Sequence, residues 1–222
     1  MDSRRHFDQI SQDYDHWKKK NWYYYQHLKQ LYQSLIPAGH KVWEIGCGTG
    51  DILISLKPSY GLGTDTSEKM IEIARNKYSH IPNVEFGVTD VADISPSHDY
   101  DYVVMADVLE HIEKLDLFFD QLNKVVKPKV KIVVSVANPF WEPLLMLAEK
   151  LKMKMPEGPH KRLLVKENET IFLKNSFKII NKGYRLLVPK KIYGSDRINS
   201  TFYKNNILAK FGFITFWILE KD

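Results

Sequence analysis

Three acidic residues accompany apolar segments in the first half of the chain, at places suited to binding a nucleoside. Glu44 precedes a glycine-rich turn at 46–50, Asp65 ends the second apolar segment, and Asp90 ends the third. A turn rich in glycine lets a ligand approach the bare backbone, and a carboxylate can accept hydrogen bonds from both ribose hydroxyls. This order of residues predicts a ligand site built on the ends of neighbouring strands.

Two histidines are candidates for a general base, because an imidazole changes its charge near neutral pH. His111 follows the fourth apolar segment, near the strand ends where α/β proteins bind their ligands. His160 stands in a Gly-Pro-His loop later in the chain, and loops carry many functional residues. A structural histidine at a helix start and an ordinary exposed loop histidine remain open interpretations of these two residues.

The spacing of the glycines distinguishes this turn from a dinucleotide fingerprint. Dinucleotide sites carry Gly-x-Gly-x-x-Gly, whereas this chain has glycines at 46, 48 and 50 with Glu44 before them. The pattern Glu-x-Gly-x-Gly-x-Gly resembles motif I of the class I S-adenosylmethionine (SAM)-dependent methyltransferases. The segments 7–15 and 100–112, the latter with Val-Leu-Glu-His-Ile, are also similar to segments of this class. The resemblance covers about residues 5–138 and the expected last strand, and points near the ubiquinone-biosynthesis-like methyltransferases.

The resemblance implies SAM as cofactor, S-adenosyl-L-homocysteine as its product, and no metal. Glu44 would bind the methionine ammonium, the glycine turn would face the methionine carboxylate, and Asp65 would hold the ribose. Asp90 with Val91 would face the adenine, which Met70 helps to enclose. The residues expected at the cofactor are, in chain order, Tyr14, Glu44, Gly46, Cys47, Gly48, Thr49, Gly50, Asp65, Thr66, Met70, Asp90, Val91, Asp107 and Val108.

Strands and helices alternate from Lys41 to Asn138, which predicts βαβ units and a parallel sheet. The resemblance implies an α/β, Rossmann-like fold with a seven-stranded, mostly parallel sheet, an antiparallel last strand and helices on both faces. N-terminal helices and a late helical and loop insertion would form a substrate cap. We expect a single domain, 1–222, that divides into an N-terminal helical cap at 1–38, a cofactor-binding core at 39–138 and late elements at 139–222.

Local patterns predict several elements within this plan. Ser67 is the expected N-cap of the helix after the second strand. The sequence does not place residues 187–208, which fit a loop or insertion. The other expected elements are a helix at 116–126, a strand at 131–137, a helix at 140–151, and late strands at 177–186 and 213–219.

Composition describes an ordinary globular protein. The chain has 222 residues, of which 44% are hydrophobic and 27% charged, with a net charge of +5. No apolar run approaches a membrane span, and the first residues lack the apolar region of a signal peptide. Cys47 is the only cysteine, so no intrachain disulfide forms. We expect a cytoplasmic protein, and we interpret Cys47 as a small filler of the turn and not as a nucleophile.

The acceptor is weakly encoded. Aromatic residues make up 13% of the chain, which favours a small apolar or aromatic metabolite that carries a hydroxyl group. The apolar segment 140–151 stands beside Lys150, Lys152 and Lys154, so a lipid-like acceptor reached from an anionic membrane surface is an alternative. A SAM-binding module without catalytic activity is another. The protein is expected to be a monomer or a homodimer.

Two further classes of enzyme are disfavoured. A nicotinamide-dependent oxidoreductase does not fit Glu44 and the glycine spacing. Enzymes that methylate amino groups of nucleic acids usually carry [Asn/Asp]-Pro-Pro-[Tyr/Phe] after the fourth strand, where this chain has Ala-Asp-Val-Leu at 106–109. A nucleic-acid partner is therefore not expected.

Overall fold

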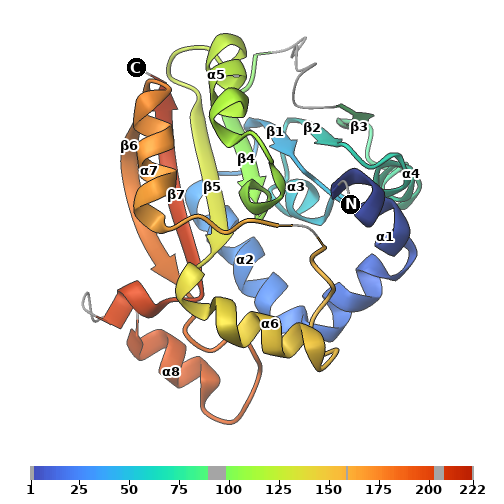
Figure 1. Cartoon of the computed structure of the whole chain (residues 1–222). Coiled ribbons are helices and arrows are strands. Elements are labelled where there is room, and N and C mark those ends of the chain that lie inside the picture. Colours follow the sequence, from blue (N-terminus) through green and yellow to red (C-terminus); the bar gives the residue numbers. More distant parts are fainter. Residues whose placement is uncertain (1–2, 90–98, 159, 203–207, 222) are drawn as a thin grey trace.

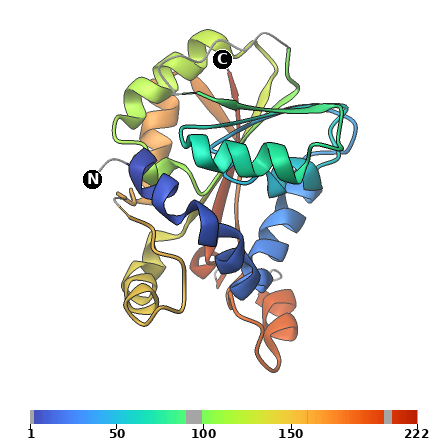
Figure 2. The same ribbon diagram turned by 90° about the vertical axis from the view of Figure 1, so that its right-hand side faces the viewer.

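The computed structural model describes residues 3–89, 99–158, 160–202 and 208–221. A seven-stranded sheet forms its centre, with helices on both faces (Figures 1 and 2). The order of the strands is β3-β2-β1-β4-β5-β7-β6. The strands are β1 (Lys41–Ile45), β2 (Tyr60–Asp65), β3 (Val84–Val88), β4 (Tyr102–Ala106), β5 (Lys131–Ala137), β6 (Phe177–Arg185) and β7 (Ile214–Lys221).

Strand directions confirm the predicted fold class. β1 pairs in parallel with β2 and β4, and the ladder continues in parallel to β3 and β5. β7 alone runs the other way, antiparallel to both β5 and β6. The strand order reverses between β1 and β4, and open α/β sheets bind ligands at the carboxyl ends of the strands beside such a reversal.

The described chain contains eight α-helices. α5 lies one residue from its predicted place, and α6 begins two residues later than expected, because Pro139–Trp141 first form a 3₁₀ turn capped by the Asn138 side chain. The sequence analysis missed α7 and α8. The helices are α1 (Ser3–Lys20), α2 (Trp22–Leu35), α3 (Asp51–Ser55), α4 (Glu68–Lys77), α5 (Leu115–Val125), α6 (Glu142–Lys150), α7 (Val165–Lys174) and α8 (Ser195–Phe202).

The two N-terminal helices rest on the carboxyl end of the sheet. α1 lies near α4, where the Ser67 hydroxyl donates a hydrogen bond of 2.6 Å to Asp8 (Figure 1). Ser67 also accepts from the amide of Met70 and so caps α4, as predicted. α2 buries Leu28 and Leu31 against the sheet. The N-terminal segment is therefore anchored to the core and stands over the ends of the strands.

The core beneath α5 and α7 is built from aromatic rings. Phe119 of α5 is fully buried, with its ring centroid 4.9 Å from that of Phe172 and 5.8 Å from that of Phe177. These edge-on contacts join α5, α7 and β6. The late elements are thus fixed to the central sheet by aromatic packing.

We predict that Phe119→Ala lowers the free energy of unfolding by about 3–5 kcal/mol, because it leaves a cavity among these rings. Urea denaturation of the purified protein measures the change. Leu117→Ala on the same helix is the matched control: its side chain is 57% exposed, so we expect a change within about 0.5 kcal/mol. Equal losses in the two variants would contradict the packing described for Phe119.

Candidate functional site

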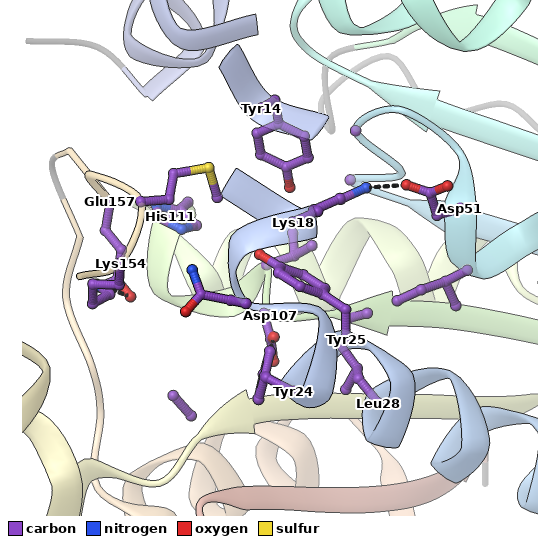
Figure 3. Close-up of a pocket in the computed structure, with 18 of the residues that line it drawn as sticks. Tyr14, Lys18, Tyr24, Tyr25, Leu28, Asp51, Asp107, His111, Lys154 and Glu157 are labelled. Atoms are coloured by element: carbon purple, nitrogen blue, oxygen red, sulfur yellow. Dashed lines mark hydrogen bonds and ion pairs between the residues drawn. The ribbon is translucent and has the colours of Figure 1, made fainter. Parts of the chain in front are cut away.

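A cavity of about 1060 Å³ opens over the carboxyl ends of β1, β2 and β4. Residues of α1 and α2 form one wall, and residues of α6 and of the segment 153–157 form another. Figure 3 shows side chains from these separate parts of the chain pointing toward the same space. The cavity therefore lies where the reversal of strand order predicts a ligand site.

The glycine turn after β1 forms part of the cavity wall. Gly46, Gly48 and Gly50 all have positive φ angles, of 71°, 51° and 81°, a backbone conformation that glycine adopts without strain. A Cβ atom on Gly46 would lie 2.4 Å from the side chain of Val108. Only a residue without a side chain fits there, which leaves backbone atoms facing the cavity.

Glu44 is buried near the end of β1, the partly buried Asp65 ends β2, and both hold this turn in place. Glu44 Oε2 accepts a hydrogen bond of 2.9 Å from the amide of Leu53. Asp65 accepts bonds of 2.8 Å from the Gly48 amide and 2.9 Å from the Ser67 amide. Burial raises the pKa of Glu44 to about 8 although the Leu53 amide opposes the shift. A cation beside Glu44 would therefore favour its ionised form.

A network of ion pairs joins α1 to the glycine turn. Lys18 Nζ lies 2.6 Å from Asp51 and 2.9 Å from the hydroxyl of Thr49 (Figure 3). Lys77 of α4 contacts Asp51 at 2.9 Å and Asp15 at 2.7 Å. Burial acts to raise the pKa of Asp51, but the Lys18 ammonium and hydrogen bonds from Lys18, Lys77 and Tyr78 lower it well below its usual range.

Asp107 follows β4 and lines the cavity opposite the glycine turn. It accepts hydrogen bonds from the hydroxyl of Tyr24 and, at 3.2 Å, from that of Ser135. Glu110 and His111 come one turn later and also line the cavity. Acidic and imidazole groups therefore gather at the end of β4.

His160 belongs to a group of ion pairs behind the cavity wall. Its Nε2 lies 3.1 Å from Glu142 and its Nδ1 2.9 Å from the carbonyl of Gly158. Arg162 joins Glu142 to Glu157 and is itself buried. His160 is not among the described residues that line the cavity, so its predicted role as a base has less geometric support than that of His111.

Most of the predicted cofactor residues meet at this cavity. Thr49 and Gly50 are not among the lining residues, and Asp90 and Val91 lie outside the described residues. The predicted residues that line the cavity are Tyr14, Glu44, Gly46, Cys47, Gly48, Asp65, Thr66, Met70, Asp107, Val108 and His111.

Several residues of the site were missed from the sequence. Lys18 lies one turn after Tyr14, with its Nζ 4.7 Å from the centre of that ring, and Asp51 directly follows the last glycine. These positions, close to the predicted Tyr14 and Gly50, are signals that could have revealed Lys18 and Asp51. Glu110 lies in the Val-Leu-Glu-His-Ile segment and could have been named from it. Tyr24 carried no such local signal.

The described part of the chain holds no group of His, Cys, Asp and Glu side chains suited to a metal ion. Nor is any helix in the described ranges both long and apolar enough to cross a membrane.

The sequence and the fold of this chain both resemble those of known methyltransferases. A sequence model of the family "Methyltransferase domain" matches residues 43–132, which include the glycine turn and β4. The chain is 26% identical over 161 residues to a ubiquinone biosynthesis O-methyltransferase of Bartonella bacilliformis, covering 67% of this chain and 64% of that protein. The middle part of the chain is thus similar in sequence to methyltransferases.

Other relatives match the same middle part of the chain. A demethylmenaquinone methyltransferase of Staphylococcus saprophyticus is 27% identical over 125 residues, 54% of each chain. The chain thus spans about half to two thirds of the length of these curated relatives. Among solved structures, a SAM-dependent methyltransferase of Thermotoga maritima, described as a possible histamine N-methyltransferase, has the same fold, with a TM-score of 0.75 at 18% identity over 99% of this chain and 100% of that one.

We predict that Asp51→Asn lowers the free energy of unfolding near neutral pH by about 1–3 kcal/mol, between the values for exposed and for buried ion pairs. The pKa of Asp51 is lowered by folding. The stability contributed by ionised Asp51 is therefore fully present above the pKa that Asp51 has in the unfolded chain. It is lost as the pH falls through the lower pKa that Asp51 has in the folded protein. The difference between the proteins should shrink below a pH of about 4. Urea denaturation across pH measures it.

Asp120→Asn is the matched control, because Asp120 forms an exposed pair with Lys124. We expect a change within about 0.5 kcal/mol for this variant. A pH-independent loss in Asp51→Asn would show that the ionic network contributes nothing to stability.

Proposed function

We propose that this protein transfers the methyl group of SAM to a hydroxyl group of a small apolar or aromatic metabolite. One observation carries the proposal: a single cavity joins the glycine turn, with Glu44 and Asp65, to a wall of aromatic side chains near Asp107. A donor and an acceptor can therefore meet inside one cavity. Holding two reactants in attack geometry is worth on the order of 7–11 kcal/mol of barrier reduction.

The lining of the cavity fits SAM at the glycine turn. Glu44 suits the methionine ammonium, because burial without a cation disfavours its charged form. Asp65 uses one lone pair on each oxygen for backbone amides, which leaves others for ribose hydroxyls. Thr66 and Met70 line the cavity beside it. SAM, when bound, supplies a methyl group already activated on a sulfonium sulfur.

The opposite part of the cavity suits an aromatic acceptor. Phe7, Trp22, Tyr24, Tyr25 and Phe213 line it, and flat apolar walls of this kind bury ring systems. The O-methyltransferase relative and the chemistry of the acidic groups near β4 both favour an oxygen acceptor. His111 remains a candidate base in this part of the site.

A second candidate is a lipid-like acceptor taken from a membrane surface. Leu144, Leu147 and Leu151 line the cavity and are 50%, 51% and 59% exposed. Exposed apolar residues at a cavity mouth let an apolar acceptor pass without crossing water. Lys150 and Lys152 beside them would attract anionic lipids.

We predict that SAM and S-adenosyl-L-homocysteine raise the melting temperature of the protein and that NAD does not. At about 100 times its Kd a ligand adds about 2.7 kcal/mol to the stability. Asp65→Asn should weaken SAM binding by about tenfold or more, because it loses charged hydrogen bonds to the ribose. A thermal-shift titration followed by calorimetry measures both effects.

Glu68→Gln is the matched control, since Glu68 is an exposed acid three residues later in the chain and should bind SAM as the unaltered protein does. A folded sample that responds to none of the three ligands would refute the proposed function.

We also predict that the protein floats with vesicles of phosphatidylglycerol at low salt if the second candidate is correct. Met146→Glu should abolish flotation, because Met146 is 62% exposed on α6 and a carboxylate there opposes contact with anionic lipid. Leu117→Glu, on the equally exposed face of α5, is the control and should float. Protein that stays at the bottom of the gradient rules out the membrane-surface acceptor.

A further inference from the structure

We propose that Asp107 is the catalytic base, which takes the proton of the acceptor hydroxyl, and that Tyr24 and Ser135 position it. The inference rests on the proposed function, because it assigns a role within the same methyl transfer. It differs from the sequence-based expectations, which placed Asp107 at the cofactor and the base at a histidine.

The backbone of Asp107 is the first observation. Its φ angle is 55°, in the left-handed region, which Asp and Asn adopt more readily than most other residues with a side chain. The amide of Asp107 is fixed by a hydrogen bond of 3.0 Å to the carbonyl of Ser135. The backbone at Asp107 is therefore held in a defined turn directly after β4. In Figure 3 the carboxylate lies between Tyr24 and the open space of the cavity.

Hydrogen bonds hold both oxygens of the carboxylate. Oδ2 accepts from the Tyr24 hydroxyl, and Oδ1 lies 3.2 Å from the Ser135 hydroxyl. Ser135 is in turn 3.0 Å from the hydroxyl of Tyr32, which is fully buried. Each carboxylate oxygen keeps a lone pair for a substrate hydroxyl. The group is therefore both fixed in orientation and able to accept a proton.

The charges around Asp107 favour a base that works near neutral pH. Burial raises the pKa of Asp107, whereas hydrogen bonds from Tyr24 and Ser135 and the charge of Arg162 lower it. The Arg162 guanidinium is shared with Glu142 and Glu157, which limits its effect. The other titratable groups that face Asp107 are Tyr14, Tyr25, Tyr32 and Glu110.

Glu110 makes a pair with Asp107 in which one member stays protonated. Burial, and then the charge of Asp107, raise the pKa of Glu110. Its Oε2 is buried without a hydrogen-bond partner among the described residues, which a charged carboxylate tolerates poorly. Carboxyl pairs whose environments separate their pKa values divide into an acid and a base. Glu110 is then the neutral member, and Asp107 carries the charge.

The proton transfer balances without any further reactant. Asp107 takes the proton as the acceptor oxygen bonds to the methyl carbon, and the pair of electrons of the broken carbon–sulfur bond stays on sulfur. The protonated Asp107 then returns its proton to water when the product leaves. No oxidant, reductant or metal enters the step as written.

Asp107→Asn tests this role. Asparagine adopts the left-handed conformation better than other residues with a side chain, so the fold should persist. The assay uses SAM with 4-methylphenol, which is neutral near neutral pH, and with 4-nitrophenol, which is largely ionised there. We expect kcat with 4-methylphenol to fall by about 100-fold or more, with a much smaller loss for 4-nitrophenol. The fall of kcat toward low pH, which is the acidic limb of its pH profile, should also disappear in Asp107→Asn.

Tyr24→Phe separates positioning from catalysis. The Tyr24 hydrogen bond lowers the pKa of Asp107, so its removal should move the acidic limb to higher pH while Asp107 still acts as the base at alkaline pH. Asp116→Asn, on the surface of α5, is the control and should leave both limb and rate unchanged.

Two outcomes overturn the inference. One is an Asp107→Asn protein that keeps its acidic limb and methylates 4-methylphenol at a rate close to that of the unaltered protein. The other is an acidic limb of the kcat profile that disappears in His111→Asn but not in Asp107→Asn. Failure of the proposed function looks different: the unaltered protein would then either not bind SAM or bind it and methylate neither phenol.

Discussion

The structure of the site depends on one constraint: carboxylates at the carboxyl ends of the strands are partly or fully shielded from water. A buried carboxylate is costly unless hydrogen bonds or opposite charges compensate it. Glu44 is compensated by the Leu53 amide of α3. Asp65 is compensated by the amides of Gly48 in the glycine turn and of Ser67 at the start of α4. Asp51 is compensated by Lys18 from α1. The turn, the helix starts and the N-terminal helix are therefore held in place by the same acids that face the cavity.

Much of the architecture could be predicted because it depends on local patterns. The strands β1 to β5 follow from continuous apolar segments, and the glycines at 46, 48 and 50 require the left-handed backbone that the structure has. The antiparallel last strand followed from resemblance and is confirmed by the pairing of β7 with β5. α8 was missed because the sequence before β7 shows no clear period, although Ser195 and Asn199 are buried four residues apart.

What the sequence could not predict are contacts between residues distant along the chain. The hydrogen bond from Tyr24 to Asp107 spans 83 positions, and no local spacing announces it. Arg162 likewise carries no local signal, whereas folding buries its guanidinium between Glu142 and Glu157. Local patterns could therefore name the glycine turn and the acids beside it, but not the long-range partners Tyr24 and Arg162.

The position of Cys47 has a consequence for the chemical durability of the protein. This thiol lines the cavity but is buried in the glycine turn. Burial, and then the nearby carboxylates of Asp65 and Glu44, raise its thiol pKa well above the ordinary value. Peroxides and alkylating agents attack the thiolate and not the thiol. The single cysteine of the chain is therefore held as the thiol, the form that reacts slowly with such agents.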